Sequence, residues 1–278
     1  MNTPEVSTNS EPNPAAATHS DGNRLDVTPG SSPSDPSLSR GLRLAALTLG
    51  AGLLAGVGSW LIGEATVSVF NPPRTPFEMM GQTLFKARFE DQLAADAKNA
   101  TLAFAVLGGL LGLSLGVAGG LAWRSTRAGA TAGGFGLVLG VLVACGVSLL
   151  ILPIYYRAVE RSPEEMSHDV LLPLLVHGGI WSACGLSGGV AFGIGIGKGR
   201  GRLTNAALGG LIGGALGAVL YEIVGVVLFA DSKTTNPISL TWHTRLLARL
   251  LVATLAGMLV AAVVNMPGRH PVGLKPSR

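Results

Sequence analysis

The sequence has little charge for its length, and long stretches have none. Asp, Glu, Lys and Arg make up 13% of the 278 residues, against about 25% in soluble globular domains. None of these four residue types occurs in six windows, which are 44–63, 99–123, 128–156, 170–197, 203–221 and 250–268. This distribution excludes an ordinary soluble domain, whose helices need charged outer faces.

Cysteine is also scarce, and the sequence has no HExxH, P-loop, CxxC or GxGxxG motif in the context that its chemistry requires. The two cysteines, Cys145 and Cys184, fall deep inside apolar windows, which is typical of buried free thiols and not of a disulfide framework or a metal motif. The basic residues lie in short loops and not in an extended patch, which argues against nucleic-acid binding. We expect no metal, no cofactor and no nucleic-acid partner.

The charge-free windows predict six transmembrane helices. A helix rises about 1.5 Å per residue, so about 20 apolar residues cross a hydrocarbon core of about 30 Å. A helix satisfies its backbone hydrogen bonds within one segment, as lipid requires. We therefore predict an all-α, polytopic bundle over 40–267, with helices at about 42–63, 100–123, 129–156, 170–197, 203–230 and 246–266.

The two ends of the chain differ in composition from the bundle. Residues 1–39 are rich in Ser, Thr, Asn and Pro and poor in large apolar residues, so they cannot bury enough surface to offset chain entropy. We predict a disordered tail there and a short basic tail over 268–278. The charges of the loops between the helices place both tails in the cytoplasm.

The loops differ in charge, and this difference predicts the orientation. The loop after the second helix contains Arg124 and Arg127 without an acid, and the loop after the fourth contains Lys198, Arg200 and Arg202 without an acid. Purely basic short loops remain on the cytoplasmic side. We therefore predict a protein of the cell membrane with the N- and C-termini in the cytoplasm.

The longest predicted outer segment is 64–98, and its pattern favours a helix. Thr75, Pro76 and Glu78 fit the start of a capping box. Downstream, Lys86 and Glu90 are four residues apart, as on a helix face. We predict a short outer helix that begins near Thr75.

Glycines recur every four residues in three of the predicted helices. This spacing places them on one helix face, where the missing side chain allows a neighbouring backbone to approach closely. We predict that the helices pack through these glycine faces, in the manner of a glycine zipper; the residues are Gly108, Gly112, Gly116, Gly120, Gly185, Gly189, Gly193, Gly197, Gly209, Gly213 and Gly217. Seven pairs of glycines are each separated by 77 residues, namely 108/185, 112/189, 116/193, 120/197, 133/210, 136/213 and 140/217. Such a constant offset would make the second and third helices and the fourth and fifth helices tandem copies of one hairpin.

Ser187 lies in the sequence Gly185-Leu186-Ser187-Gly188-Gly189, which has the G-x-S-x-G pattern. This motif, with the helix count, resembles rhomboid intramembrane proteases, which also have a six-helix core and a serine in a glycine-rich fourth helix. That resemblance implies a histidine base in helix six, and this sequence has none there. His177 precedes Ser187 by ten residues, or about 15 Å along a helix. The sequence therefore favours a packing role for Ser187 and no catalytic residue.

A few ionisable residues lie inside or near the ends of the predicted spans. We expect His177 and Glu222 at matching depth, with Tyr221 beside Glu222, and Arg245 and Arg249 one turn apart at the start of the last helix. Such groups are costly in lipid and mark a functional hypothesis. Glu222 has two possible partners, His177 and Arg249, and the sequence does not choose between them.

The absence of motifs favours a multi-pass membrane protein of structural or assembly type that is not an enzyme. The alternative is a small transporter or channel with an outward-facing polar site at His177, Glu222, Arg245 and Arg249. An intramembrane enzyme is the third possibility. Expected partners are the lipid bilayer and either another membrane protein or a second copy of this chain.

Overall fold

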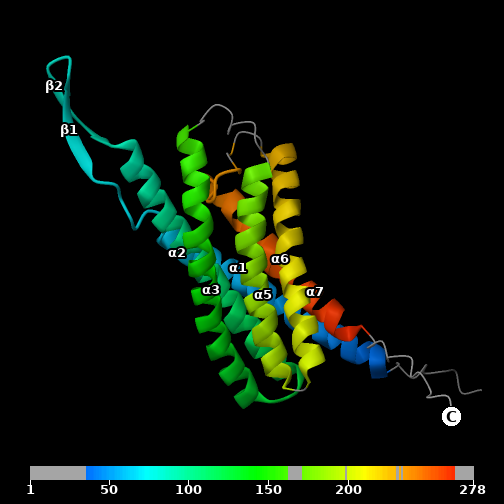
Figure 1. Cartoon of the computed structure of the whole chain (residues 1–278). Coiled ribbons are helices and arrows are strands. Elements are labelled where there is room, and N and C mark those ends of the chain that lie inside the picture. The colour runs from blue at the N-terminus through cyan, green and yellow to red at the C-terminus, as the bar shows by residue number, and fades with distance from the viewer. Residues whose placement is uncertain (1–35, 162–170, 198, 230–231, 233, 267–278) are drawn as a thin grey trace, which may run out of the picture. The chain divides into compact units, whose positions relative to one another are not determined.

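The computed structural model describes residues 36–161, 171–197, 199–229, 232 and 234–266. Both predicted tails, 1–35 of the first and 268–278 of the second, fall outside this part of the chain. In the described part, the elements in chain order are α1 (Pro36–Ala65), β1 (Arg74–Met79), β2 (Gln82–Ala87), α2 (Phe89–Ala122), α3 (Thr126–Arg161), α5 (Leu171–Ile196), α6 (Arg200–Leu228) and α7 (Trp242–Asn265). Figure 1 shows the long helices packed together.

The predicted helical membrane fold is confirmed at this level. Within the described residues, six helices are long and apolar enough to cross a membrane, and together they indicate a multi-pass membrane protein. Several of them extend beyond the charge-free windows: α2, for example, begins at Phe89, and Glu90 and Asp91 occupy its first turn. Acidic residues stabilise that end of a helix because the helix dipole is positive there.

Two helices form the interior of the bundle. In both α2 and α5, 67% of the most apolar 18-residue window is buried, whereas the figure for α3 is 22%. α2 packs against α1, α3 and α5, and α5 also packs against α3 and α6, while α7 closes the bundle between α1 and α6. The polar side chains carried by α5 are therefore enclosed by protein and not by lipid.

The segment predicted to be a helix from Thr75 is a β-hairpin. Strands β1 and β2 pair antiparallel, with Arg74 opposite Ala87 and Met79 opposite Gln82. Figure 1 shows the hairpin projecting away from the helices. The two loop residues explain the difference, because Met80 and Gly81 both have positive φ values, 54° and 73°. Two such residues in a row make the tight turn that joins twisted antiparallel strands, and they end any helix.

Consecutive helices run in opposite directions, so the bundle has two distinct ends. The hairpin end contains the C-termini of α1, α3 and α6 and the N-termini of α2, α5 and α7. The opposite end, here called the arginine end, contains the α2–α3 and α5–α6 turns. Gly197 and Gly199 in the second turn have φ values of 71° and 87°, which glycine adopts at little cost.

Candidate functional site

His177 of α5 and Glu222 of α6 form a buried pair near the hairpin end. The His177 Nδ1 and Glu222 Oε1 atoms are 2.5 Å apart, and the two side chains are 1% and 3% exposed. Of the two partners that the sequence left open for Glu222, the structure has His177. The pair joins two helices across the interior, where a polar group without a partner would be expensive.

The other ring nitrogen of His177 faces a backbone carbonyl. Its Nε2 atom lies 3.4 Å from the carbonyl oxygen of Pro237. The short contact between Nδ1 and the Glu222 carboxyl group needs one proton between the two atoms, held by either partner. His177 therefore has an oxygen neighbour at each of its ring nitrogens.

Aromatic rings pack against the histidine of this pair. The imidazole of His177 stacks on Trp181, with ring centroids 4.8 Å apart, and meets Tyr221 edge-on at 5.7 Å. The ring centroids of Trp181 and Tyr221 are also close, 5.3 Å apart. Tyr221 therefore belongs to the cluster, as the sequence suggested, but it packs against the histidine side of the pair.

A small cavity lies beside the pair. It has a volume of about 30 Å³, and its lining includes His177, Tyr221, Ser239, Arg245 and Arg249. Such a volume holds about two water molecules. Glu222 Oε2 is buried and has no hydrogen-bond partner among the described residues.

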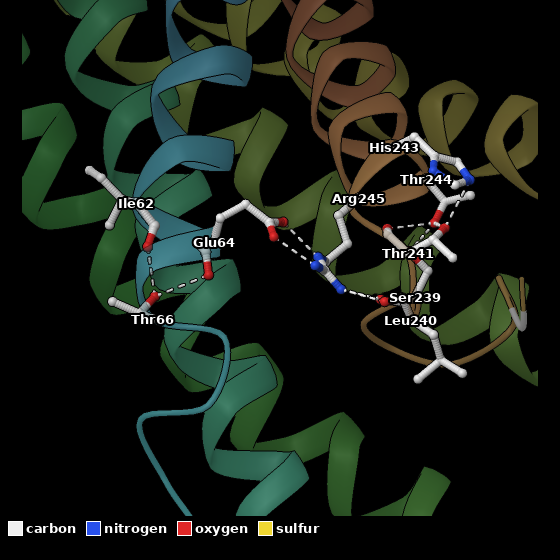
Figure 2. A network of polar contacts seen from close by, with 10 residues as sticks. Ile62, Glu64, Thr66, Ser239, Leu240, Thr241, His243, Thr244 and Arg245 are labelled. Carbon is white, nitrogen blue, oxygen red and sulfur yellow. Dashed lines mark hydrogen bonds and ion pairs between the residues drawn. The ribbon is translucent and has the colours of Figure 1, made fainter.

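Arg245 lies at the edge of this cavity and is bound mainly by Glu64 of α1. Its Nε and Nη2 atoms each donate to a Glu64 carboxylate oxygen at 2.6 Å. Its Nη1 donates to the carbonyls of Ser239 and Leu240, at 3.0 and 2.8 Å. Figure 2 shows Glu64 and Arg245 pointing toward each other, with Arg245 reaching these two carbonyls on its other side. This bidentate geometry is the strong form of an arginine–carboxylate contact.

Arg249 is more deeply buried, at 8% exposure, and it does not pair with Glu222. Its Nη1 donates to the Ser59 carbonyl at 2.6 Å, and its guanidinium packs against Gly63, where a Cβ would collide with it. No carboxylate of the described residues lies within ion-pair distance of Arg249. The predicted cluster is thus two separate units, a His–Glu pair between α5 and α6 and an arginine pair that holds α1 to α7.

Sequence reasoning missed several members of this region. Glu64 is one of them: it directly follows the first charge-free window, as Arg245 directly precedes the last predicted helix, and that shared depth was a usable signal. Ser239 and Thr244 bond through their hydroxyls at 2.7 Å. Thr241 extends this chain to Thr244 at the same distance, as Figure 2 shows. No sequence pattern pointed to these hydroxyl groups.

Asn99 is a further buried polar residue that the sequence analysis overlooked. Its side-chain amide accepts from the Phe70 N–H at 3.0 Å and donates to the Phe70 carbonyl at 2.9 Å. The amide therefore substitutes for a strand partner and ties the segment before the hairpin to α2. A lone asparagine at the start of an apolar window was the available signal.

Ser187 makes the contact expected of a packing residue. Its Oγ donates to the carbonyl of Cys184 in the preceding turn of α5, at 2.7 Å, and it is 2% exposed. His177, the histidine in the same helix, is engaged with Glu222 and Pro237. A serine nucleophile needs a base within hydrogen-bond reach, and this serine bonds the helix backbone instead.

Most of the glycines that recur every four residues face the backbone of a neighbouring helix. A Cβ built on any of them would meet main-chain atoms of the adjacent helix, as in the opposed pairs Gly108/Gly140, Gly112/Gly136 and Gly185/Gly210. Gly209, Gly213 and Gly217 face α7 in the same way. Gly197 is different: it has a positive φ, and the nearest atom to its Cβ would be an oxygen of its own helix at 3.9 Å. It is a turn residue.

The contacts do not follow the constant offset of 77 residues. Gly140 of α3 faces Gly108 of α2, but Gly217, 77 residues after Gly140, faces Val252 of α7 and not Gly185. Gly185 faces Gly210, which is 70 residues after Gly140. The α5–α6 hairpin therefore matches the α2–α3 hairpin only if the second arm is displaced by about two helical turns.

Comparisons with known proteins give no relative. No family model, curated protein or solved structure matches this chain. Among the described residues, no group of three or more His, Cys, Asp or Glu side chains could hold a metal ion.

Proposed function

We propose that this chain is a multi-pass integral membrane protein of structural or assembly type and not an enzyme. One observation carries the proposal: the intramembrane ionisable groups are engaged within the bundle. Glu222 contacts His177, Arg245 is bound by Glu64, and Arg249 donates to a helix carbonyl. The adjoining cavity of about 30 Å³ is far smaller than the 300–1,000 Å³, roughly, of small-molecule sites.

Glycine faces support the same proposal. The approach of α2 to α3 and of α5 to α6 places backbone against backbone at successive turns. Lipid supplies little hydrophobic drive between helices, so close packing is a main source of their association. We infer that a glycine zipper holds each of these hairpins.

The second candidate is a small transporter or channel that handles protons at His177 and Glu222. It is favoured by the proton that the pair must share and by the unpartnered Oε2 atom of Glu222. Ionisable residues inside membranes commonly act in proton relays. The cavity beside His177 would then be part of a water path from the hairpin end.

Proton flux into vesicles distinguishes the two candidates. The full chain, reconstituted into vesicles that contain a pH-sensitive dye, should pass no more protons after a pH step than empty vesicles. Glu222→Gln should match the wild type, as should Glu78→Gln in the exposed hairpin, the matched control. Flux that depends on the wild-type protein and disappears only in Glu222→Gln would refute the structural role and establish the second candidate.

We further propose a cell-membrane location with both termini in the cytoplasm. The basic turns at 124–127 and 198–202 support it. In a background without native cysteines, Thr83→Cys in the hairpin should react with an impermeant thiol reagent on intact cells. Ser125→Cys, in the α2–α3 turn, should react only after the membrane is opened. Labelling of Ser125→Cys in intact cells would show that the orientation is the reverse of the one proposed.

A further inference from the structure

Four arginines surround a cavity at the arginine end of the bundle. The cavity has a volume of about 690 Å³, and its lining includes Arg40, Arg43, Arg124 and Arg202, together with Trp123. They come from three places in the chain: the start of α1, the α2–α3 turn and the start of α6. The lining contains no Asp or Glu.

Two of the four arginines are held by contacts that leave their charge in place. Arg43 donates one hydrogen bond to the Leu121 carbonyl at 3.1 Å, and the Arg202 guanidinium lies over the Trp123 ring, 5.2 Å from its centroid. None of the four makes an ion pair with a described carboxylate. Arg124 has a φ of 57°, a conformation that glycine adopts more easily. The pocket therefore concentrates positive charge that an anion would neutralise.

An apolar groove has lining residues next to those of this pocket on both α1 and α2, although the two share none. It has a volume of about 550 Å³ and runs between α1 and α2, from Leu47 and Leu121 to Gly58 and Ile62. Leu121 of the groove is followed in sequence by Ala122, which lines the arginine pocket. A Cβ at Gly50, inside the groove, would meet no atom within 4 Å, so the groove is open at that level.

The groove is long enough to hold a lipid chain. Its α1 wall extends from Ala46 to Ile62, which is about 24 Å of helix, whereas one leaflet of hydrocarbon is about 15 Å thick. A cationic pocket with an apolar groove beside it along α1 and α2 matches an amphiphile with a phosphate and acyl chains. Basic pockets between transmembrane helices bind anionic head groups in this way.

We propose that the arginine pocket and the α1–α2 groove together bind one anionic phospholipid. Its phosphate contacts the guanidinium groups of Arg43, Arg124 and Arg202, and an acyl chain lies in the groove along Gly50 and Gly58. This inference is independent of the role of His177 and Glu222, which lie at the opposite end of the bundle.

Native mass spectrometry of the full chain in neutral detergent tests the proposal. With added phosphatidylglycerol, the protein should retain one lipid, in preference to phosphatidylcholine at equal concentration. The double variant Arg43→Gln/Arg202→Gln should bind it about 30-fold more weakly, since each arginine near an anionic lipid contributes about 1 kcal/mol. Arg127→Gln, an exposed arginine outside the pocket lining, is the matched control and should bind as the wild type does.

A second variant tests the groove without changing charge. Gly50→Leu should fill the groove and weaken phosphatidylglycerol binding, whereas Gly134→Leu, where a Cβ also meets nothing within 4 Å but which lies outside the groove lining, should not. Equal retention of phosphatidylcholine, or equally tight binding of glycerol 3-phosphate, would overturn the proposal. It would also be overturned by a dimer that Gly50→Leu dissociates while lipid binding persists, because the groove would then hold a second copy.

Discussion

Replacing Glu222 by leucine should lower the free energy of unfolding by about 3–5 kcal/mol, the loss typical of a broken buried ion pair. The substitution removes the Nδ1 partner of His177, whose side chain is 1% exposed. The change should be visible in denaturant titrations of the protein in detergent micelles, followed by circular dichroism.

The double variant His177→Phe/Glu222→Leu provides the decisive comparison. Replacing both members of a buried pair by apolar residues is often neutral or stabilising, so most of the loss should be recovered. Phenylalanine keeps a ring against Trp181 and Tyr221. Losses that simply add in the double variant would mean that the two side chains do not stabilise the bundle as a pair.

Glu64→Gln serves as the matched control for this experiment. Its ion pair with Arg245 is 27% and 14% exposed, so water screens it, and the glutamine can still accept a hydrogen bond. Because the pair is only partly buried and the hydrogen bond is kept, we expect a clearly smaller loss than for Glu222→Leu. A loss equal to that of Glu222→Leu would show that burial is not what makes the His177–Glu222 contact important.

Leucine at Gly112 should destabilise the bundle by about 3 kcal/mol or more, at or beyond the upper end of ordinary overpacking. A Cβ at this position would overlap the Gly136 carbonyl group, so the α2 and α3 backbones would have to separate and lose dispersion contacts along the crossing. Gly189→Leu should act similarly through Ala206 of α6. Folded yield by size-exclusion chromatography and unfolding in micelles measure both effects.

Two helical glycines without close neighbours are the controls. At Gly146 and Gly178 a Cβ would meet no atom within 4 Å, so Gly146→Leu and Gly178→Leu should fold with nearly normal yield. A helix-favouring residue there even removes the entropic penalty of glycine. Similar losses at all four positions would show that the glycine spacing has no special role in packing.

The hairpin shows why one segment was misread. Thr75, Pro76 and Glu78 have the spacing of a capping box, and Lys86 and Glu90 have helical spacing, but these signals belong to different elements. Glu90 lies in the first turn of α2, whereas Lys86 is on β2 opposite Thr75. The turn at Met80 and Gly81 decides that this segment is a hairpin. Methionine rarely adopts a positive φ, so the residue types there were a weak indication of a turn.

The His177–Glu222 contact shows how much of the site could be predicted. Counting residues from the helix ends placed both at one depth, because rise along a helix is constant. Depth does not specify which way a helix face points or which helix lies beside it. Arg249 was an equal candidate for Glu222 on depth alone, yet its guanidinium lies against α1, at Ser59 and Gly63.

The sequence by itself determined the six membrane spans, because a helix in lipid makes its hydrogen bonds within its own segment and needs only a long enough apolar window. The tertiary structure decided which helices are neighbours and how each is rotated about its axis. Those choices depend on backbone contacts such as Gly112 with Gly136 and Gly185 with Gly210. They set the pairing of His177 with Glu222 and of Arg245 with Glu64, because a side chain can meet only the residues that helix packing brings within its reach.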